Sequence, residues 1–455
     1  MRRRGLLAFL VLVLAGLPAA GAGPKTPSSS HRGIPLAEYA ARRAAAMERL
    51  DDGLLVVRGT EEEEFGSVWR FRQNNWLMYL SGADVPGATL LLNPFAQQGE
   101  RETLYLPARD LAQERWTGPK IGPGQDAQRL FGIATRDLAH LDDDVRAIGE
   151  RLSKSGRRVV LYAIAPSGPD ARFTRDGAFA EVLRGLLPHG SSIVDARGEI
   201  GELRRAKSEA ELALLARAIE ITTEAHREVA RTVAPGRFEY EVEAAIVATF
   251  LRNGAQRAGF PSIVGSGIYS TVLHYNENSK QIEAGDLVVV DIGAEFNHYT
   301  ADLTRTWPAS GRFTPRQREV YQLVLDAQEA AARAYRPGMA IRDLQAAAAA
   351  TMRKSALRDT KGRTLDTAFI HGLCHFLGMD VHDVGDAGRP LAPGDVITIE
   401  PGIYLPDERL GVRIEDDYLV TARGVEWISR APREADEIEA LMREPWTGPA
   451  AREIG

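Results

Sequence analysis

The stretch from Gly285 to Trp307, GDLVVVDIGAEFNHYTADLTRTW, decides the fold of this chain, because it places Asp291 and Asp302 in two strands that pair. Its first part is apolar and mostly β-branched, residues 293–298 carry turn signals, and its last part is β-prone again, which predicts a hairpin. A carboxylate at the end of a buried apolar run is costly unless a positive charge or a metal meets it. The stretch therefore predicts that Asp291 is paired with a cation.

A second stretch, Gly394 to Gly402 (GDVITIEPG), repeats this pattern with Glu400 in the place of Asp291. Both carboxylates lie six residues after the glycine of a Gly-Asp pair, and the strand that follows, GVRIEDDYLV, carries Glu415 as the first stretch carries Asp302. Further upstream, PGRFEYEVEAAI matches PGMAIRDLQAAA. The sequence therefore predicts an internal duplication that brings four carboxylates together about a pseudo-two-fold axis.

Four carboxylates in one pocket repel one another at low dielectric, and two divalent ions would neutralise all four. One half also carries an insert, His371 to Asp383 (HGLCHFLGMDVHD), that breaks the repeat and adds histidines. The HGLCH segment has the spacing of a zinc-protease helix, but Gly372 stands where the HExxH motif requires a glutamate, which excludes that class. One of these histidines can complete the metal site. An oxygen-rich ligand set with one imidazole favours Mn²⁺, with zinc, cobalt and iron as the alternatives.

The first residues, MRRRGLLAFLVLVLAGLPAAGAG, have the form of a secretory signal peptide, with a basic start, a twelve-residue apolar run from Leu6 to Leu17 and an exit of small residues. We therefore predict that residues 1–22 are removed and that the protein is exported, either to a periplasm or out of the cell. A retained N-terminal anchor is the alternative. Nothing later in the chain resembles a transmembrane segment, so we expect no membrane span in the mature chain.

The rest of the chain predicts two domains. Residues 34–198 alternate short apolar runs, which begin near residues 54, 88, 102 and 158, with helix-like segments, and they hold no cluster of potential ligands. We interpret them as a smaller α/β domain that serves shape and assembly, and we expect a homo-oligomer, a dimer or a tetramer. A net charge of -6 with both signs interspersed argues against nucleic acid as a partner.

Residues 199–445 predict an α+β domain, because helical patterns and antiparallel hairpins are segregated along them. Ser208 and Glu211 form a capping-box pattern at the start of the first of its helices. We expect helices near 208–232, 239–253, 315–335 and 340–356, and strands near 286–292, 298–306, 395–400 and 411–420.

Several segments in the same order resemble the Xaa-Pro aminopeptidase (aminopeptidase P) group of the pita-bread metallopeptidases, family M24. They are DIGAEFNHYTADLTRTW, HGLCHFLGMDVHDVG, ITIEPGIY and GVRIEDD around the expected metal site, and FRQNNWLMYLSG from Phe71 in the N-terminal domain. The resemblance covers most of the mature chain. It implies a pita-bread catalytic domain with its internal pseudo-two-fold duplication, preceded by a creatinase-like N-terminal domain.

The resemblance also implies the site residues. It makes five residues the ligands of two divalent metal ions, the second and fifth of them bridging: Asp291, Asp302, His375, Glu400 and Glu415. It gives His274 and His382 the handling of the substrate and of the oxyanion, with His371 and Arg413 in support, and Tyr404 matches a tyrosine near the site of the family.

The positions of the two outer histidines within the repeats support that role. His274 lies seventeen residues before Asp291, and His382 lies eighteen residues before Glu400, so each precedes the matching strand of its own half. A hydrogen-bonded histidine of the core is the alternative for either residue. This matched placement favours a role in handling the substrate over a place in the core.

The implied reaction releases the N-terminal residue from peptides with proline at the second position. A hydroxide shared by two cations is available at neutral pH, and a metal-bound carbonyl is polarised toward attack. Glu400 resembles the residue of the family that moves the proton of the attacking water, which the departing proline nitrogen needs.

Three alternatives remain open at this point. The dipeptidase prolidase shares nearly every motif, although the ending PREADEIEALM favours the aminopeptidase. Creatinase uses the same scaffold without metals, which the intact ligand set disfavours. A non-catalytic binding protein on a pita-bread fold would have lost ligands, and this chain has lost none.

Overall fold

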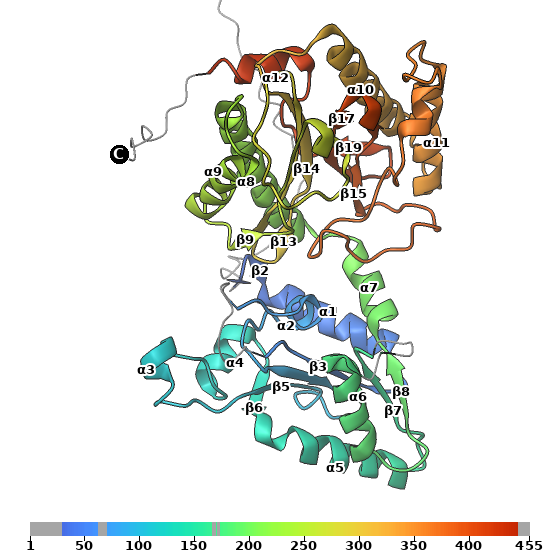
Figure 1. Ribbon diagram of the computed structural model, residues 1–455. Helices are drawn as coiled ribbons and strands as arrows, with labels where there is room; N and C mark the ends of the chain where they lie inside the picture. The colour runs from blue at the N-terminus through green and yellow to red at the C-terminus, as the bar shows by residue number, and fades with distance from the viewer. Residues whose placement is uncertain (1–29, 62–70, 166–169, 171–172, 445–455) are drawn as a thin grey trace, which may run out of the picture.

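The computed structural model describes residues 30–61, 71–165, 170 and 173–444, so the predicted signal peptide, residues 1–22, lies outside the described residues. The described chain forms an N-terminal and a C-terminal part, and α7 (Arg197–Arg205) runs from one to the other (Figure 1). The predicted domain boundary, between residues 198 and 199, thus lies within a helix. Within the described ranges, no helix is both long enough and apolar enough to cross a membrane.

The N-terminal part is built on a six-stranded mixed sheet with the order β6-β5-β4-β3-β7-β8. Its strands are β3 (Leu54–Arg58), β4 (Thr89–Leu92), β5 (Glu102–Leu106), β6 (Ala134–Asp137), β7 (Val160–Ala163) and β8 (Ser192–Asp195). The pairs β3-β4 and β4-β5 are antiparallel, and the pairs β5-β6, β3-β7 and β7-β8 are parallel. The four predicted apolar runs are therefore the four central strands of the sheet.

Strand β3 shows why this sheet is covered on both faces. Leu54 and Val56 pack in the core that contains α5 (Leu141–Lys154) and α6 (Arg175–Leu186), whereas Leu55 and Val57 pack against α1 (Leu36–Arg49) and α2 (Asn75–Ser81). Figure 1 shows the two pairs of helices on opposite sides of the strands. A continuous apolar run is what a strand buried on both faces requires. The remaining short elements are β1 (Ser30–His31), β2 (Ile34–Pro35), α3 (Glu114–Thr117) and α4 (Gln125–Phe131).

The C-terminal part consists of two halves with the same order of elements: two helices, a strand, a hairpin and a strand. The first half has α8 (Glu209–Thr232), α9 (Glu239–Arg252), β11 (Leu287–Ile292), β12 (Ala294–Phe296), β13 (Tyr299–Thr300) and β14 (Leu303–Pro308). The second half has α10 (Pro315–Ala334), α11 (Ile341–Lys354), β15 (Val396–Ile399), β16 (Gly402–Leu405), β17 (Leu410–Arg413) and β18 (Asp416–Val420). This repeated order confirms the predicted duplication. Outside the repeat lie β9 (Arg257–Ala258), β10 (Ile263–Ser266), β19 (Val425–Trp427) and α12 (Ala435–Leu441).

The strands of the two halves meet in the middle of this part, with α8 and α9 on one side and α10 and α11 on the other (Figure 1). The sheets β10-β11-β14 and β15-β18-β19 join at a bridge between Thr304 and Glu415, where the Glu415 amide donates to the Thr304 carbonyl at 3.1 Å. At the start of α8, Ser208 and Glu211 form the predicted capping box. The duplication therefore places strand ends from both halves side by side at the centre of the domain.

The structure corrects the predicted strands 298–306 and 411–420, each of which is interrupted in front of its second half. The interruptions fall at residues 301–302 and at Ile414, after which Glu415 forms an isolated bridge with Thr304. The Asp302 amide leaves the ladder and donates to Oδ2 of Asp417 at 3.3 Å. The predicted turn is also shorter than expected, because residues 294–296 form β12 and the tight turn is made by Asn297 and His298, with φ of 47° and 72°.

Candidate metal centre

Strand ends from both halves carry the four predicted carboxylates. Asp291 lies on β11, Asp302 directly precedes β14, Glu400 directly follows β15 and Glu415 directly precedes β18. His375 lies on the insert before β15, where its amide and carbonyl are both bonded to the threonine at position 398. The structure brings all five predicted ligands to one cavity of about 270 Å³.

The His375 ring points its Nε2 atom at three of these carboxylates. Nε2 lies 3.3 Å from Asp302 Oδ2, 3.5 Å from Glu400 Oε1 and 3.8 Å from Glu415 Oε1. The other ring nitrogen, Nδ1, lies 3.1 Å from the carbonyl oxygen of Phe376. A carbonyl can only accept, so the Nδ1 atom carries the hydrogen and the Nε2 lone pair faces the carboxylates. This is the orientation that a metal-binding imidazole needs.

Asp302 and Glu415 occupy the centre of the cluster. Together with His375 they offer ligand atoms that all lie within 4.8 Å of one another. The charge of Asp291 acts on both of them, and Glu400 is affected in turn by the charges of Glu415 and Asp302. Central carboxylates with neighbours on two sides are where bridging ligands would lie.

The pKa values of the carboxylates show that the protein alone does not supply enough positive charge to balance the cluster. Burial first, and then the neighbouring Glu415 and Asp291, raise the pKa of Asp302 well above its usual value. Burial and Glu415 likewise raise the pKa of Glu400, and burial and Asp291 raise the pKa of Glu415 to about 7. Among the described residues, the buried atoms Asp291 Oδ1 and Asp302 Oδ1 have no hydrogen-bond partner. Divalent cations would both neutralise these groups and bind the unpartnered oxygens, so the residues fit a metal centre.

Arg413 fixes one side of the cluster. Its Nη2 atom donates to Asp291 Oδ2 at 2.7 Å, its Nε atom donates to the Thr304 hydroxyl at 3.1 Å, and that hydroxyl donates to Glu415 Oε2 at 2.7 Å. Arg413 and Thr304 are both fully buried or nearly so. The pair therefore orients one predicted terminal ligand and one predicted bridging ligand. The sequence did not single out Thr304, whose only signal was its place on β14, two residues after Asp302.

His371 and Tyr404 continue this network on the other side of Arg413. Arg413 Nη1 donates to the Tyr404 hydroxyl at 3.1 Å, and that oxygen lies 2.9 Å from His371 Nε2. His371 Nδ1 lies 2.8 Å from the Gly372 carbonyl, so Nδ1 donates and Nε2 accepts from the tyrosine. Burial and the charge of Arg413 lower the pKa of His371 to about 4. His371 is therefore neutral and keeps the tyrosine hydroxyl in place.

His274 and His382 stand at the exposed mouth of the cavity. Both line the 270 Å³ cavity and also the adjoining one of about 230 Å³, which contains His371 and Arg413. The rings of His382 and His375 are in edge contact, with centroids 4.4 Å apart. Burial and the neighbouring His375 lower the pKa of His382. All nine predicted site residues thus lie around two adjoining cavities.

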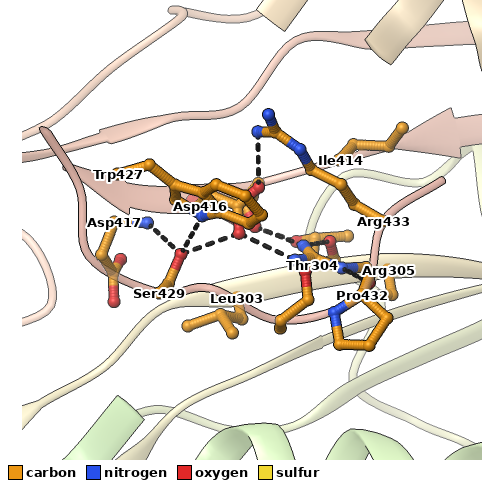
Figure 2. A network of polar contacts seen from close by, with 12 residues as sticks. Leu303, Thr304, Arg305, Ile414, Asp416, Asp417, Trp427, Ser429, Pro432 and Arg433 are labelled. Carbon is orange, nitrogen blue, oxygen red and sulfur yellow. Dashed lines mark hydrogen bonds and ion pairs between the residues drawn. The ribbon is translucent and has the colours of Figure 1, made fainter. Parts of the chain in front are cut away.

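A buried ion-pair network lies behind the cluster (Figure 2). Arg305 is fully buried, and its five N–H groups donate to the carbonyls of Thr304, Glu415, Ala431 and Pro432 and to Asp416 Oδ1. Asp416 also accepts from Ser429 at 2.7 Å and from Gln328 at 3.1 Å, and Arg433 lies 3.5 Å away. The network ties β14 to β18 beside Asp302 and Glu415. The network could not be predicted from the sequence, because nothing distinguishes Asp416 from its acidic neighbours Glu415 and Asp417.

We expect Asp416→Ala to lower the free energy of unfolding by about 3–5 kcal/mol, because it leaves the buried Arg305 without its counter-charge. The midpoint of urea denaturation, followed by circular dichroism, measures this loss. Asp407→Ala is the matched control, since Asp407 pairs with Lys361 on the surface, where both side chains are more than half exposed. That midpoint should stay unchanged. Equal shifts of the denaturation midpoint in the two variants would show that the network does not stabilise the fold.

The N-terminal and C-terminal parts of the chain each match a known protein family. Residues 213–422 match metallopeptidase family M24, and residues 39–156 match the aminopeptidase P N-terminal domain. The Xaa-Pro aminopeptidase of Escherichia coli K12 is 33% identical over 89% of this chain and 97% of its own length. A putative aminopeptidase P from Bacillus anthracis superposes with a TM-score of 0.81 at 31% identity, over 90% of this chain and 98% of that one.

A zinc-substituted form of the Escherichia coli aminopeptidase P in complex with product superposes with a TM-score of 0.79 at 31% identity, over 91% of this chain and 99% of that one. These similarities extend over both parts of the fold and include the segments that carry the carboxylate cluster. The chain therefore belongs to metallopeptidase family M24, within its group of Xaa-Pro aminopeptidases.

Proposed function

We propose that this protein is a metal-dependent aminopeptidase that releases the N-terminal residue from peptides with proline at the second position. The observation that carries the proposal is the convergence of four carboxylates and His375 from the two halves in one cavity, with His274 and His382 at its mouth. Prolidase is not favoured, because the curated relatives are named as aminopeptidases. Cleavage of Ala-Pro-Ala by metal-reconstituted protein, and its loss after chelation, test the function.

The proposed ligands are Asp291, Asp302, His375, Glu400 and Glu415. When bound there, two divalent cations would polarise the scissile carbonyl and lower the pKa of a water molecule. Glu400 lies on the exposed side of the cluster, 3.6 Å from His371 Nδ1 and 3.5 Å from His375 Nε2. Its carboxylate takes the proton of the attacking water and passes it to the departing proline nitrogen.

The outer histidines act on the substrate in this proposal. His382 and His274 both line the two cavities, and an N–H of either ring can donate to the carbonyl oxygen as negative charge develops on it. The Arg413, Tyr404 and His371 chain keeps Asp291 and the cavity wall in a fixed geometry. Preorganised donors of this kind need no rearrangement during the reaction.

We expect His382→Ala to lower kcat for Ala-Pro-Ala by roughly 100-fold while metal content per chain stays close to that of the unchanged protein. The side chain is proposed to donate to the oxyanion, so its loss removes transition-state stabilisation and leaves the ligand set intact. Steady-state kinetics and elemental analysis of the same sample provide the two values. A parallel loss of metal and turnover would make His382 a ligand.

Membership of a metallopeptidase family implies divalent metal ions, and we propose Mn²⁺ as the ion in the cell, because oxygen atoms dominate the ligand set. Activity after reconstitution with Mn²⁺, Zn²⁺, Co²⁺ or Fe²⁺ in turn tests this choice, and the highest turnover with zinc would overturn it. We also propose a homo-oligomer, a dimer or a tetramer. Light scattering that gives the mass of a single chain would exclude it.

We propose further that the protein is exported and that residues 1–22 are its signal peptide, on the basis of the basic, apolar and small-residue order of that segment. N-terminal sequencing of the protein from its native host should begin near Gly23. Intact Met1 on protein from the cytoplasmic fraction would contradict export.

A further inference from the structure

The segment that carries His274 is anchored to one buried carboxylate. Glu239 is the first residue of α9 and is fully buried. Its Oε1 atom accepts from the Ser266 amide and from the Ser266 hydroxyl, both at 2.7 Å. Its Oε2 atom accepts from the Tyr275 hydroxyl and from the Lys280 amide, both at 2.8 Å. His274 lies between these anchoring points in the chain and is the direct neighbour of Tyr275.

Glu239 has no basic side chain as a partner within the described part of the chain, although burial of a carboxylate is costly. The four hydrogen bonds replace a counter-charge, and two of their donors are backbone amides that cannot rotate away. The Glu239 amide also donates to the Lys280 carbonyl at 3.0 Å. Segment 266–280 is therefore held at both ends by one residue.

The duplication shows that the fold itself does not require a carboxylate at this position. The Pro-Gly turns before α9 and α11 match, and Glu239, the first residue of α9, corresponds to Ile341, the first residue of α11. Ile341 is an apolar part of the core. In the second half the cavity histidine, His382, lies on the insert that breaks the repeat. The carboxylate is thus present only in the half whose cavity histidine lies on segment 266–280.

We propose that Glu239 is a positioning residue for His274: it fixes segment 266–280 so that the imidazole reaches the cavity. This inference rests on the proposed function, since it assigns Glu239 an effect on turnover that acts through His274. The aromatic stack of Tyr269 on Tyr275, with centroids 4.5 Å apart and planes 2° apart, adds a contact within the segment.

Glu239→Gln is the sharpest variant, because it keeps the shape of the side chain and replaces one acceptor oxygen with an NH₂ group. Each oxygen of Glu239 faces one backbone N–H, so one of these amides must then face another donor. A displacement of a catalytic group by about 1 Å can cost roughly 100-fold in rate, so we expect kcat for Ala-Pro-Ala to fall by roughly 10- to 100-fold. KM and metal content should change by less than about two-fold, because the side chains of the five proposed ligands have no hydrogen bond to segment 266–280 among the described residues.

The matched control is Glu241→Gln, in the same first turn of α9, where the carboxylate caps Phe238 and pairs with Arg237 without touching segment 266–280. The decisive comparison is a double-mutant cycle with His274→Ala. If Glu239 acts through His274, Glu239→Gln should change kcat by less than about two-fold in the His274→Ala background. Full additivity, a kcat equal to that of Glu241→Gln, or a loss of metal would overturn the inference.

This experiment distinguishes a wrong function from a wrong positioning role for Glu239. If the unchanged protein does not cleave Ala-Pro-Ala, the proposed function is wrong. If it does, and His274→Ala is slow while Glu239→Gln is not, only the positioning inference is wrong. Should Glu239→Gln not fold, Tyr275→Phe removes the hydroxyl that donates to Glu239 and accepts from the Ser279 amide, and it should lower kcat by a few-fold only where His274 is present.

Discussion

Asp302→Asn and Glu415→Gln are each expected to remove both metal ions and to lower the turnover of Ala-Pro-Ala by roughly three orders of magnitude, about 4 kcal/mol of transition-state stabilisation. The reason is their place in the cluster. Both side chains lie with His375 in the group of ligand atoms within 4.8 Å, and both are flanked by further carboxylates. A ligand that serves two ions cannot be removed for only one of them.

The matched control is Asp395→Asn. Asp395 is a fully buried carboxylate at the start of β15, the strand that leads to Glu400, but it pairs with Arg205 and does not line the cavity. This variant should keep two ions per chain whatever it loses in stability. Elemental analysis and steady-state kinetics on the same preparations compare the three variants. Retention of one ion with normal turnover in Asp302→Asn or Glu415→Gln would show that the bridging positions are misplaced.

The second large effect concerns the substrate. N-acetyl-Ala-Pro-Ala should be cleaved at least about 100-fold more slowly than Ala-Pro-Ala, because acetylation removes the ammonium group that an acidic cavity can hold. In the proposed reaction, that ammonium would hold the first residue beside a carboxylate, and bound cations would polarise the first carbonyl, so the cut would fall after residue one. An internal peptide bond has no such anchor. The ratio of kcat/KM for the two peptides under one metal condition measures the effect.

Proline at the second position should matter for a different reason. Its nitrogen has no N–H, so a cavity that fits the ring gains orientation where a secondary amide would offer a hydrogen bond. Ala-Ala-Ala should therefore be a poorer substrate than Ala-Pro-Ala through a lower kcat. Ala-Pro serves as the control for peptide length. Rapid hydrolysis of the acetylated peptide would contradict the anchoring argument, and a strong preference for Ala-Pro would favour a dipeptidase.

The duplication and the metal cluster could be predicted from the sequence because both repeat. Asp291 and Glu400 follow matching Gly-Asp pairs, and Asp302 and Glu415 follow on the next strands, so periodic spacing alone brought four distant carboxylates together. The ends of the four helices were predicted within one or two residues, because apolar spacing and the Ser208 cap are local signals.

The supporting contacts could not be predicted, because they join segments far apart in the chain. Thr304 contacts Arg413 and Glu415 across 109 and 111 positions, and Arg305 contacts Asp416 across 111. Nothing in the local sequence separates such a threonine or arginine from any other residue of a strand. The interruptions at residues 301–302 and at Ile414 were missed likewise, since β-propensity continues through these positions while the regular strand pairing stops.

The most direct test of the dinuclear centre is a titration of metal-free protein with Mn²⁺, in which bound metal per chain and the rate of Ala-Pro-Ala cleavage are measured on the same samples. Two ions per chain at saturation are predicted, with activity that is absent in the metal-free protein, rises with occupancy and is lost again after chelation. Full activity in protein that binds no metal would contradict the central claim, and saturation at one ion per chain with full activity would contradict its dinuclear form.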